Sequence, residues 1–192
     1  MKIFFTYIFS LFLFATNVTA QNVPNYNPYR IMTPAELSVY RQSIWDTLPA
    51  AVGWVNDFEG LYDKIQEDSL ESMIQHFEKK TSIEIAIVTV DSNMVSQDKF
   101  NEFTYRLLKI WGIGKIAKSN GMVICICKDY KSIYISSDFG LDTYLSDYDK
   151  YKIVNKSVLP YFKKNYYFNG TLSGLNAILE KINRKWSKNN KT

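Results

Sequence analysis

Two short apolar runs constrain the fold of this chain more than any other feature. Residues 82–90 read SIEIAIVTV and residues 121–127 read GMVICIC. Both runs are rich in β-branched and aliphatic residues and nearly continuous, as expected of strands that are buried on both faces. A sheet with two buried faces needs a layer of helices on each side. The sequence therefore predicts a three-layer α/β/α sandwich around a small mixed sheet, with a central strand at 83–90.

The segments around these runs show the periodicity of helices. Capping-box patterns predict helices that begin after Thr33 and after Asp63, the first of which ends at Pro49. Apolar stripes predict further helices at 100–111, 151–159 and 172–186. The run SIYIS follows GMVICIC after the short polar segment KDYK, which predicts an antiparallel hairpin.

The first 20 residues have the pattern of a cleaved signal peptide. One lysine precedes an apolar run that ends in the short residues Val18, Thr19 and Ala20. Residues 21–49 are predicted to form an N-terminal arm and an extra helix. After the leader, no apolar run reaches the roughly 18 to 20 residues that span a bilayer. We therefore expect an exported chain, periplasmic or secreted, with no transmembrane segment in its mature form.

The composition leaves little room for histidine or thiol chemistry. His76 is the single histidine, and it lies off the apolar stripe of its predicted helix, so we expect it to be a solvated flank residue. Cys125 and Cys127 lie two apart on one face of a predicted strand, where geometry opposes a mutual disulfide. A metal site at this pair is one alternative, and two buried small apolar residues is the other. A multi-histidine metal site is excluded by count, and one badly placed histidine gives Ser-His-Asp or Cys-His catalysis little to work with.

Charge is distributed unevenly along the chain. Residues 21–149 contain 12 basic and 18 acidic side chains, a net charge of −6, whereas residues 150–192 contain 10 basic and one acidic, a net charge of +9. The basic segment has two interpretations: a solvated helix face, or a surface that docks on an anionic cell-envelope partner. Nucleic acid is not an expected partner of an exported chain of this kind.

Acidic residues gather after the predicted hairpin, in the stretch SSDFGLDTYLSDYDKY at 136–151. Such a density of carboxylates repels itself unless water or a cation screens it. Calcium binds six to eight oxygen ligands and favours such loops, although the EF-hand spacing is missing. A solvated acidic loop is the alternative.

Two polar pairs lie upstream of this stretch. Asn56 and Asp57 have three interpretations: a turn, a helix cap or a cation ligand. Asn120–Gly121 has the pattern of a tight turn.

Four segments of the chain resemble the TPM domain family. They are VNDFEG at 55–60, WGIGKIAKSNG at 111–121, FGLDTYLSD at 139–147 and PYFKKNYYFNG at 160–170. The resemblance places a TPM domain at 50–187, followed by a frayed basic tail at 188–192. It implies a Rossmann-like α/β/α sandwich, divalent-cation binding, chiefly of calcium, at one end of the sheet, and an acid phosphatase activity reported for the family.

The resemblance also implies a set of metal ligands, namely Asp57, Asn120, Asp142 and Asp147, with Asn56 as a turn residue. The chain departs from the family at Lys118–Ser119, where a Lys-Asp pair is common, and at Asp142, where the family commonly has glutamate. One carboxylate is therefore lost, and another is gained at Asp138, where the family commonly has glycine.

Two functions follow from these observations. The first is an exported module that binds a divalent cation, calcium or magnesium, and acts in the assembly or maintenance of envelope proteins. The second is a metal-assisted phosphomonoesterase, an acid phosphatase in which Arg106, Lys115 and Lys118 contact phosphate. The sequence contains no recognisable pair of nucleophile and base, so enzymatic activity stays an open question at this stage.

Overall fold

The computed structural model describes residues 31–115 and 118–189. The predicted signal peptide and residues 21–30 of the predicted arm lie outside the described residues. From Met32 onward the chain forms one compact unit, which is described here by itself. In this described part, every helix is too short or too polar to cross a bilayer.

A four-stranded mixed sheet lies at the centre of this unit, in the order β1-β2-β3-β4. The pairs β1–β2 and β2–β3 are parallel, and β3–β4 is the predicted antiparallel hairpin. The strands are β1 (Val55–Asp57), β2 (Glu84–Thr89), β3 (Gly121–Cys127) and β4 (Ser132–Ser137). The sequence analysis missed β1 because three residues carry no periodic signal.

The helices surround this sheet in the predicted order. They are α1 (Pro34–Asp46), α2 (Lys64–Thr81), α3 (Phe100–Ile110), α4 (Asp147–Ile153), α5 (Leu159–Phe162) and α6 (Tyr167–Asn189), with shorter turns η1 (Gln97–Lys99), η2 (Phe139–Leu141) and η3 (Val154–Val158). Both predicted capping boxes are present: Thr33 caps α1 with Glu36, and Asp63 caps α2 with Gln66. Their reciprocal hydrogen bonds satisfy backbone donors that a helix start leaves free.

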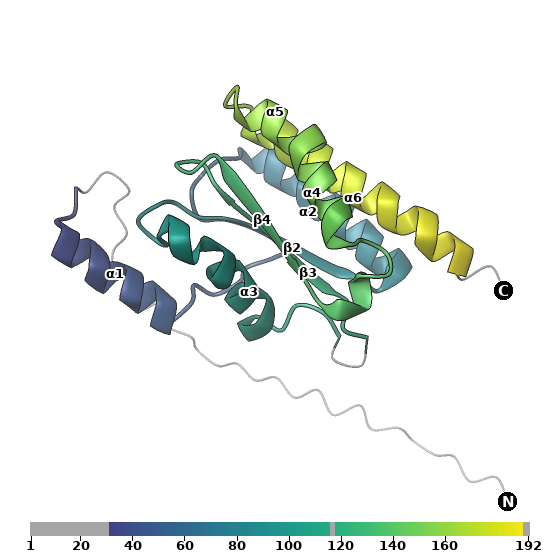
Figure 1. The fold of residues 1–192 in the computed structure, drawn as a ribbon, viewed down its shortest axis with the longest axis horizontal. Coiled ribbons are helices and arrows are strands. Elements are labelled where there is room, and N and C mark those ends of the chain that lie inside the picture. The colour runs from purple at the N-terminus through teal and green to yellow at the C-terminus, as the bar shows by residue number, and fades with distance from the viewer. Residues whose placement is uncertain (1–30, 116–117, 190–192) are drawn as a thin grey trace, which may run out of the picture. The chain divides into compact units, whose positions relative to one another are not determined.

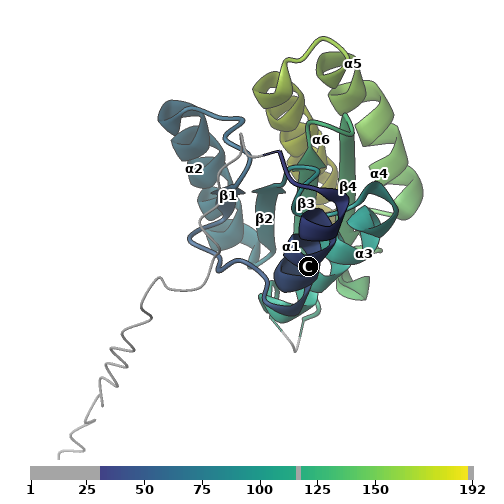
Figure 2. The ribbon, with the colours of Figure 1, turned by 90° about the vertical axis from the view of Figure 1, so that its left-hand side faces the viewer.

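The helices cover the two faces of the sheet as separate layers (Figures 1 and 2). On one face, α2, α6 and the α4–α5 segment pack on Ile85, Ile87 and Ile124 in a single apolar cluster. On the other face, α3 packs on β3 and β4, and the ring of Phe100 meets that of Tyr134 at 5.3 Å. The predicted three-layer α/β/α architecture is therefore confirmed.

Helix α1 attaches to α3 through contacts that Trp45 makes with Phe103 and Arg106. The rings of Trp45 and Phe103 lie 6.4 Å apart, and Arg106 stacks over Trp45 while its Nη2 donates to the Trp45 carbonyl at 2.8 Å. Tyr40 and Ile44 are the buried residues of α1. The extra N-terminal helix predicted from the sequence is thus an integral part of this unit.

The acidic stretch after the hairpin is more helical than the sequence predicts. Ser146 forms a capping box with Asp149 that starts α4 four residues earlier than expected. The chain then continues through the π-turn η3 and past Pro160, where the predicted helix was expected to end. Proline is tolerated there because it occupies one of the first positions of α5, where a backbone N–H has no helical acceptor to lose.

The loop before β3 corrects a second prediction. The left-handed residue is Ser119, with φ of 44°, and not Asn120 or Gly121. Gly121 is required for a different reason: a Cβ atom at this position would lie 1.9 Å from the carbonyl oxygen of Ile113. The backbones of two segments meet there at a distance that no side chain permits.

This contact generates a prediction about stability. The Gly121→Ala substitution is expected to lower the free energy of unfolding by more than about 2 kcal/mol, because the clash is with backbone that cannot rotate away. The control is Gly60→Ala, a glycine that has a positive φ, unlike Gly121, but open space around it, and this substitution should cost about 1 to 2 kcal/mol. Urea unfolding measures both values, and equal losses would contradict the assignment.

Candidate functional site

The three parallel strands end at one edge of the sheet, which we call the carboxyl edge. Asp57 ends β1 and pairs with Thr89, which ends β2 and pairs with Ile126 near the end of β3. The chain leaves β1 toward α2 on one face and leaves β2 toward α3 on the other. Where neighbouring connections depart to opposite faces, a crevice opens beyond the strand ends, and ligands of α/β sheets commonly bind there.

Asp57 holds the chain together at this edge. Its carboxylate accepts hydrogen bonds from the backbone N–H of Leu61 at 3.0 Å and of Tyr62 at 2.8 Å, and also from the hydroxyl of Thr89. The Thr89 oxygen in turn accepts from the Glu59 N–H at 3.0 Å. The end of β1 and the loop that follows it are therefore fastened to the end of β2.

Asn56 fastens the preceding loop in the same way. Its side-chain oxygen accepts from the Val52 N–H and its amide donates to the Gly53 carbonyl, both at 2.8 Å. The residue is buried, with 1% of its surface exposed. Asn56 thus performs the turn role that the sequence analysis gave it.

Glu59 is the most unusual side chain at the carboxyl edge. Only 4% of it is exposed, and its Oε2 accepts from the Lys128 N–H at 3.0 Å. Among the residues that the structure describes, no donor reaches Oε1, and the Lys128 ammonium is 4.0 Å away, beyond hydrogen-bonding distance. A buried carboxylate oxygen without a donor costs free energy and calls for an explanation.

Two further acids stand at the ends of the neighbouring strands. Asp91 follows β2, is buried, and accepts from the N–H groups of Asn93 and Met94 at 2.9 Å. Asp129 follows β3, and its carboxylate accepts from both the N–H and the hydroxyl of Ser92. Together with Asp57 and Glu59 they form what we call the edge acids.

The edge acids influence one another electrostatically. Burial raises the pKa of Glu59 from 4.5 to about 7, while the Lys128 N–H and ammonium oppose this shift and the charges of Asp129 and Asp57 add to it. Burial also raises the pKa of Asp91, against the two backbone N–H groups that it accepts from. The negative charge gathered at this edge is therefore only partly compensated by Lys128.

The edge acids do not form a complete set of metal ligands. Among the described residues, no three His, Cys, Asp or Glu side chains approach closely enough to hold a metal ion between them. A cation at this edge would take a small number of protein oxygens, with water or backbone carbonyls completing its shell, as magnesium and calcium both permit.

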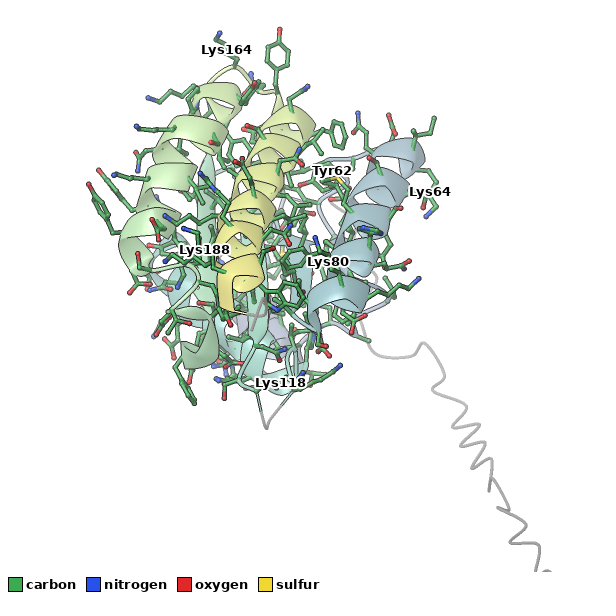
Figure 3. All side chains as sticks on the ribbon, turned by 90° about the vertical axis from the view of Figure 1, so that its right-hand side faces the viewer. Tyr62, Lys64, Lys80, Lys118, Lys164 and Lys188 are labelled. Atoms are coloured by element: carbon green, nitrogen blue, oxygen red, sulfur yellow. The ribbon has the colours of Figure 1, made fainter. Side chains whose placement is uncertain are left out.

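The structure does not bring the four sequence-predicted ligands together. Asn120 precedes β3 and lies at the opposite edge, about 17 Å from the carboxyl edge for six residues of strand. In Figure 3, Tyr62, which donates to Asp57, lies well above Lys118 of the loop before β3. The Asn120 oxygen accepts from the Lys115 N–H at 2.8 Å, and its amide donates to the Ser82 carbonyl. Its observed contacts are thus those of a structural residue.

Asp142 and Asp147 are also distant from Asp57. Asp142 is exposed and follows η2, at the edge where β4 ends beside the start of β3. Asp147 lies in the first turn of α4 with 96% of its side chain exposed, where it pairs with Lys150 at 2.8 Å. One ion cannot contact all four residues, so of the predicted set the carboxyl edge contains Asp57 alone.

The predicted phosphate contacts are not assembled beside Asp57 either. Arg106 is engaged with Trp45 on the α1–α3 side, and Lys115 pairs with Glu78 at 3.6 Å at the opposite edge. Lys118 belongs to the same loop before β3. The arrangement therefore adds no observation in favour of the phosphatase alternative.

Sequence reasoning missed Glu59, Asp91 and Asp129 as site residues. The signal was present, because an acidic residue follows each of the three parallel strands, in VND-FE, TVD and CKD. Recognising it required knowing that all three strands run in the same direction, which places their ends together. One of these three parallel strands, β1, is not predicted from the sequence.

The two cysteines are buried small residues and the histidine is a solvated flank residue, as the simpler interpretation of each predicted. Cys125 and Cys127 are free and buried, and burial raises the pKa of both thiols. His76 is exposed on α2, away from the buried residues of that helix. Cys127 ends β3 at the carboxyl edge, where the charges of Glu59 and Asp129 add to the rise of its pKa, whereas His76 lies on α2 away from this edge.

Comparison with solved structures shows the same fold in three bacterial proteins. The N-terminal domain of a protein from P. gingivalis is 22% identical, with a TM-score of 0.65, over 82% of this chain and 96% of that one. The BA42 protein from Bizionia argentinensis is 19% identical, with a TM-score of 0.56, over 66% and 85%. The N-terminal domain of the cg2496 protein from Corynebacterium glutamicum is 14% identical, with a TM-score of 0.51, over 74% and 86%.

At these identities the structures support the fold alone. No curated protein matches the chain. The TPM domain, as a family, matches residues 55–181, which covers the sheet, its carboxyl edge and most of α6. Because this match spans more than half of the sequence, the chain belongs to the TPM domain family.

Proposed function

We propose that this TPM domain binds a divalent cation, calcium or magnesium, at the carboxyl edge, with Glu59 and Asp57 as its protein ligands. The observation that supports this most directly is the donor-free Oε1 of the buried Glu59. A hard cation would supply the close partner that this oxygen lacks, since carboxylate oxygens are the ligands it prefers. Asp57 still has lone pairs to offer, because a carboxylate provides about four acceptor sites and three are used.

A cation at this edge would also relieve the repulsion among the edge acids. Asp57 and Asp129 are close enough to Glu59 for their charges to raise its pKa. Neutralising part of that charge favours the ionised form of Glu59, which is the form that binds metal. The residues present therefore fit a cation of modest affinity that retains several water ligands.

The place of action that we propose is the cell envelope. The leader-like first 20 residues support export, and the two free buried cysteines are compatible with a chain that needs no disulfide. An exported cation-binding domain without an assembled phosphate site is better suited to assisting the assembly or maintenance of envelope proteins than to hydrolysing a substrate.

Cation binding is expected to raise the melting temperature of the mature chain. A ligand present at 100 times its dissociation constant adds about 2.7 kcal/mol to the free energy of unfolding. Thermal melting with calcium or magnesium up to millimolar concentrations measures the shift. The Glu59→Gln substitution should abolish it, because the amide keeps the size of the side chain and removes the anionic ligand.

The matched control is Asp147→Asn, which removes a carboxylate of the sequence-predicted ligand set at an exposed position. This variant should keep the full shift in melting temperature. The proposal fails if the unmodified chain shows no shift, or if the shift survives Glu59→Gln and disappears in Asp147→Asn.

Glu59 should also make the stability of the cation-free chain depend on pH. Its pKa is about 7 when folded and 4.5 ordinarily, so between these values the unfolded chain releases a proton that the folded chain retains. The free energy of unfolding should therefore fall as pH rises from about 4.5 to 7. Above pH 7 the whole cost of the buried carboxylate is present, on the order of 1–3 kcal/mol.

Denaturant unfolding in EDTA at pH 5 and pH 8 tests this expectation. The gain in stability of Glu59→Gln over the unmodified chain should be larger at pH 8 than at pH 5. A gain that is the same at both values would show that Glu59 does not titrate in this range.

A further inference from the structure

We propose that the outer face of α4, η3 and α5 docks this domain on an anionic phospholipid bilayer. Six exposed residues make up this face, which we call the Tyr–Lys stripe: Tyr148, Tyr151, Lys152, Lys156, Lys163 and Lys164. The proposal concerns a different surface from the carboxyl edge and does not depend on cation binding.

The spacing of these residues places the stripe opposite the core. Positions 148, 151, 152 and 156 follow helical spacing and are all exposed, whereas Val158 and Phe162 of the same segment are fully buried in the apolar cluster. Tyr148 and Tyr151 are 64% and 65% exposed, which is high for two aromatic rings one turn apart. Lys164 projects outward from the end of α5 (Figure 3).

The acidic residues of this segment are neutralised by partners outside the stripe. Asp147 pairs with Lys150 at 2.8 Å, and Asp149 pairs with Lys181 of α6 at 2.7 Å. Within the described residues, no carboxylate lies within ion-pair distance of the four stripe lysines, and Lys152 instead lies over the Tyr148 ring at 4.3 Å. Four positive charges are therefore available to an external partner.

The tyrosines favour a bilayer over a soluble polyanion. A tyrosine ring has an apolar body and a polar hydroxyl, so it is stabilised at the headgroup level of a membrane. Lysine stems lie along apolar surface while their ammonium groups reach anionic headgroups. A soluble hydrophilic polyanion would bind the lysines but gain nothing from the exposed aromatic rings. The combination of exposed lysines and tyrosines therefore favours an anionic lipid surface.

Co-sedimentation with vesicles tests the proposal on the predicted mature chain from Gln21, in EDTA so that no cation bridges protein and lipid. Binding to phosphatidylglycerol-containing vesicles is expected at low salt, weakened at high salt, and absent from pure phosphatidylcholine. Lys152→Gln with Lys156→Gln should reduce the partition coefficient at least tenfold. Lys79→Gln with Lys80→Gln, which removes the same charge from exposed positions on α2, should change it less than twofold.

The tyrosines are tested by Tyr148→Ser with Tyr151→Ser, which should lower vesicle binding at least fivefold and leave binding to poly-L-glutamate unchanged. Tyr105→Ser on α3, 53% exposed, is the matched control and should have no effect. The proposal is overturned if the unmodified chain does not sediment with anionic vesicles, or if both lysine pairs matter equally. It is also overturned if the tyrosine variant binds vesicles normally, which would identify a soluble polyanion as the partner.

Discussion

The burial of β2 and β3 on both faces is the constraint on which the rest of this structure depends. Every residue of β3, and every residue of β2 after Glu84, is buried. A strand in this position has no face to give to water, so helices must cover both sides of the sheet. The chain meets this requirement by sending α2 to one face and α3 to the other. The carboxyl edge lies where those connections diverge.

Polar groups at that edge divide into two kinds. Asp57 and Asn56 use their side chains to close loops, and each polar atom has a partner within the protein. Glu59 differs because one of its oxygens is buried without a donor. Native structures tolerate few such groups, and a functional site is one of the accepted reasons for keeping one. The contrast between these two acids makes Glu59 the principal candidate ligand, while Asp57, with three of its about four acceptor sites used, has one left to offer.

The charge asymmetry of the chain becomes a spatial asymmetry in the fold. The edge acids come from loops after three different strands, whereas the exposed lysines of the stripe come from one continuous helical segment. Asp149 pairs with Lys181 and Lys185 of α6, and Asp147 pairs with Lys150 within α4. Among the described residues, the four lysines of the stripe are therefore left without a carboxylate partner. One domain thus has an acidic carboxyl edge and a separate basic aromatic surface.

The sequence by itself determined the architecture, because helix caps and apolar periodicity are local signals that neighbouring residues carry. The capping boxes at Thr33 and Asp63, the β3–β4 hairpin and the three layers were all predicted correctly. The family motif also named Asp57, which the fold places at the carboxyl edge. Only the tertiary structure decided which acids are neighbours, because proximity at a sheet edge depends on strand direction and on β1, whose three residues carry no periodic signal. It separated Asp57 from Asn120 by the length of β2, and it buried Glu59 beside Lys128, a residue 69 positions away along the chain.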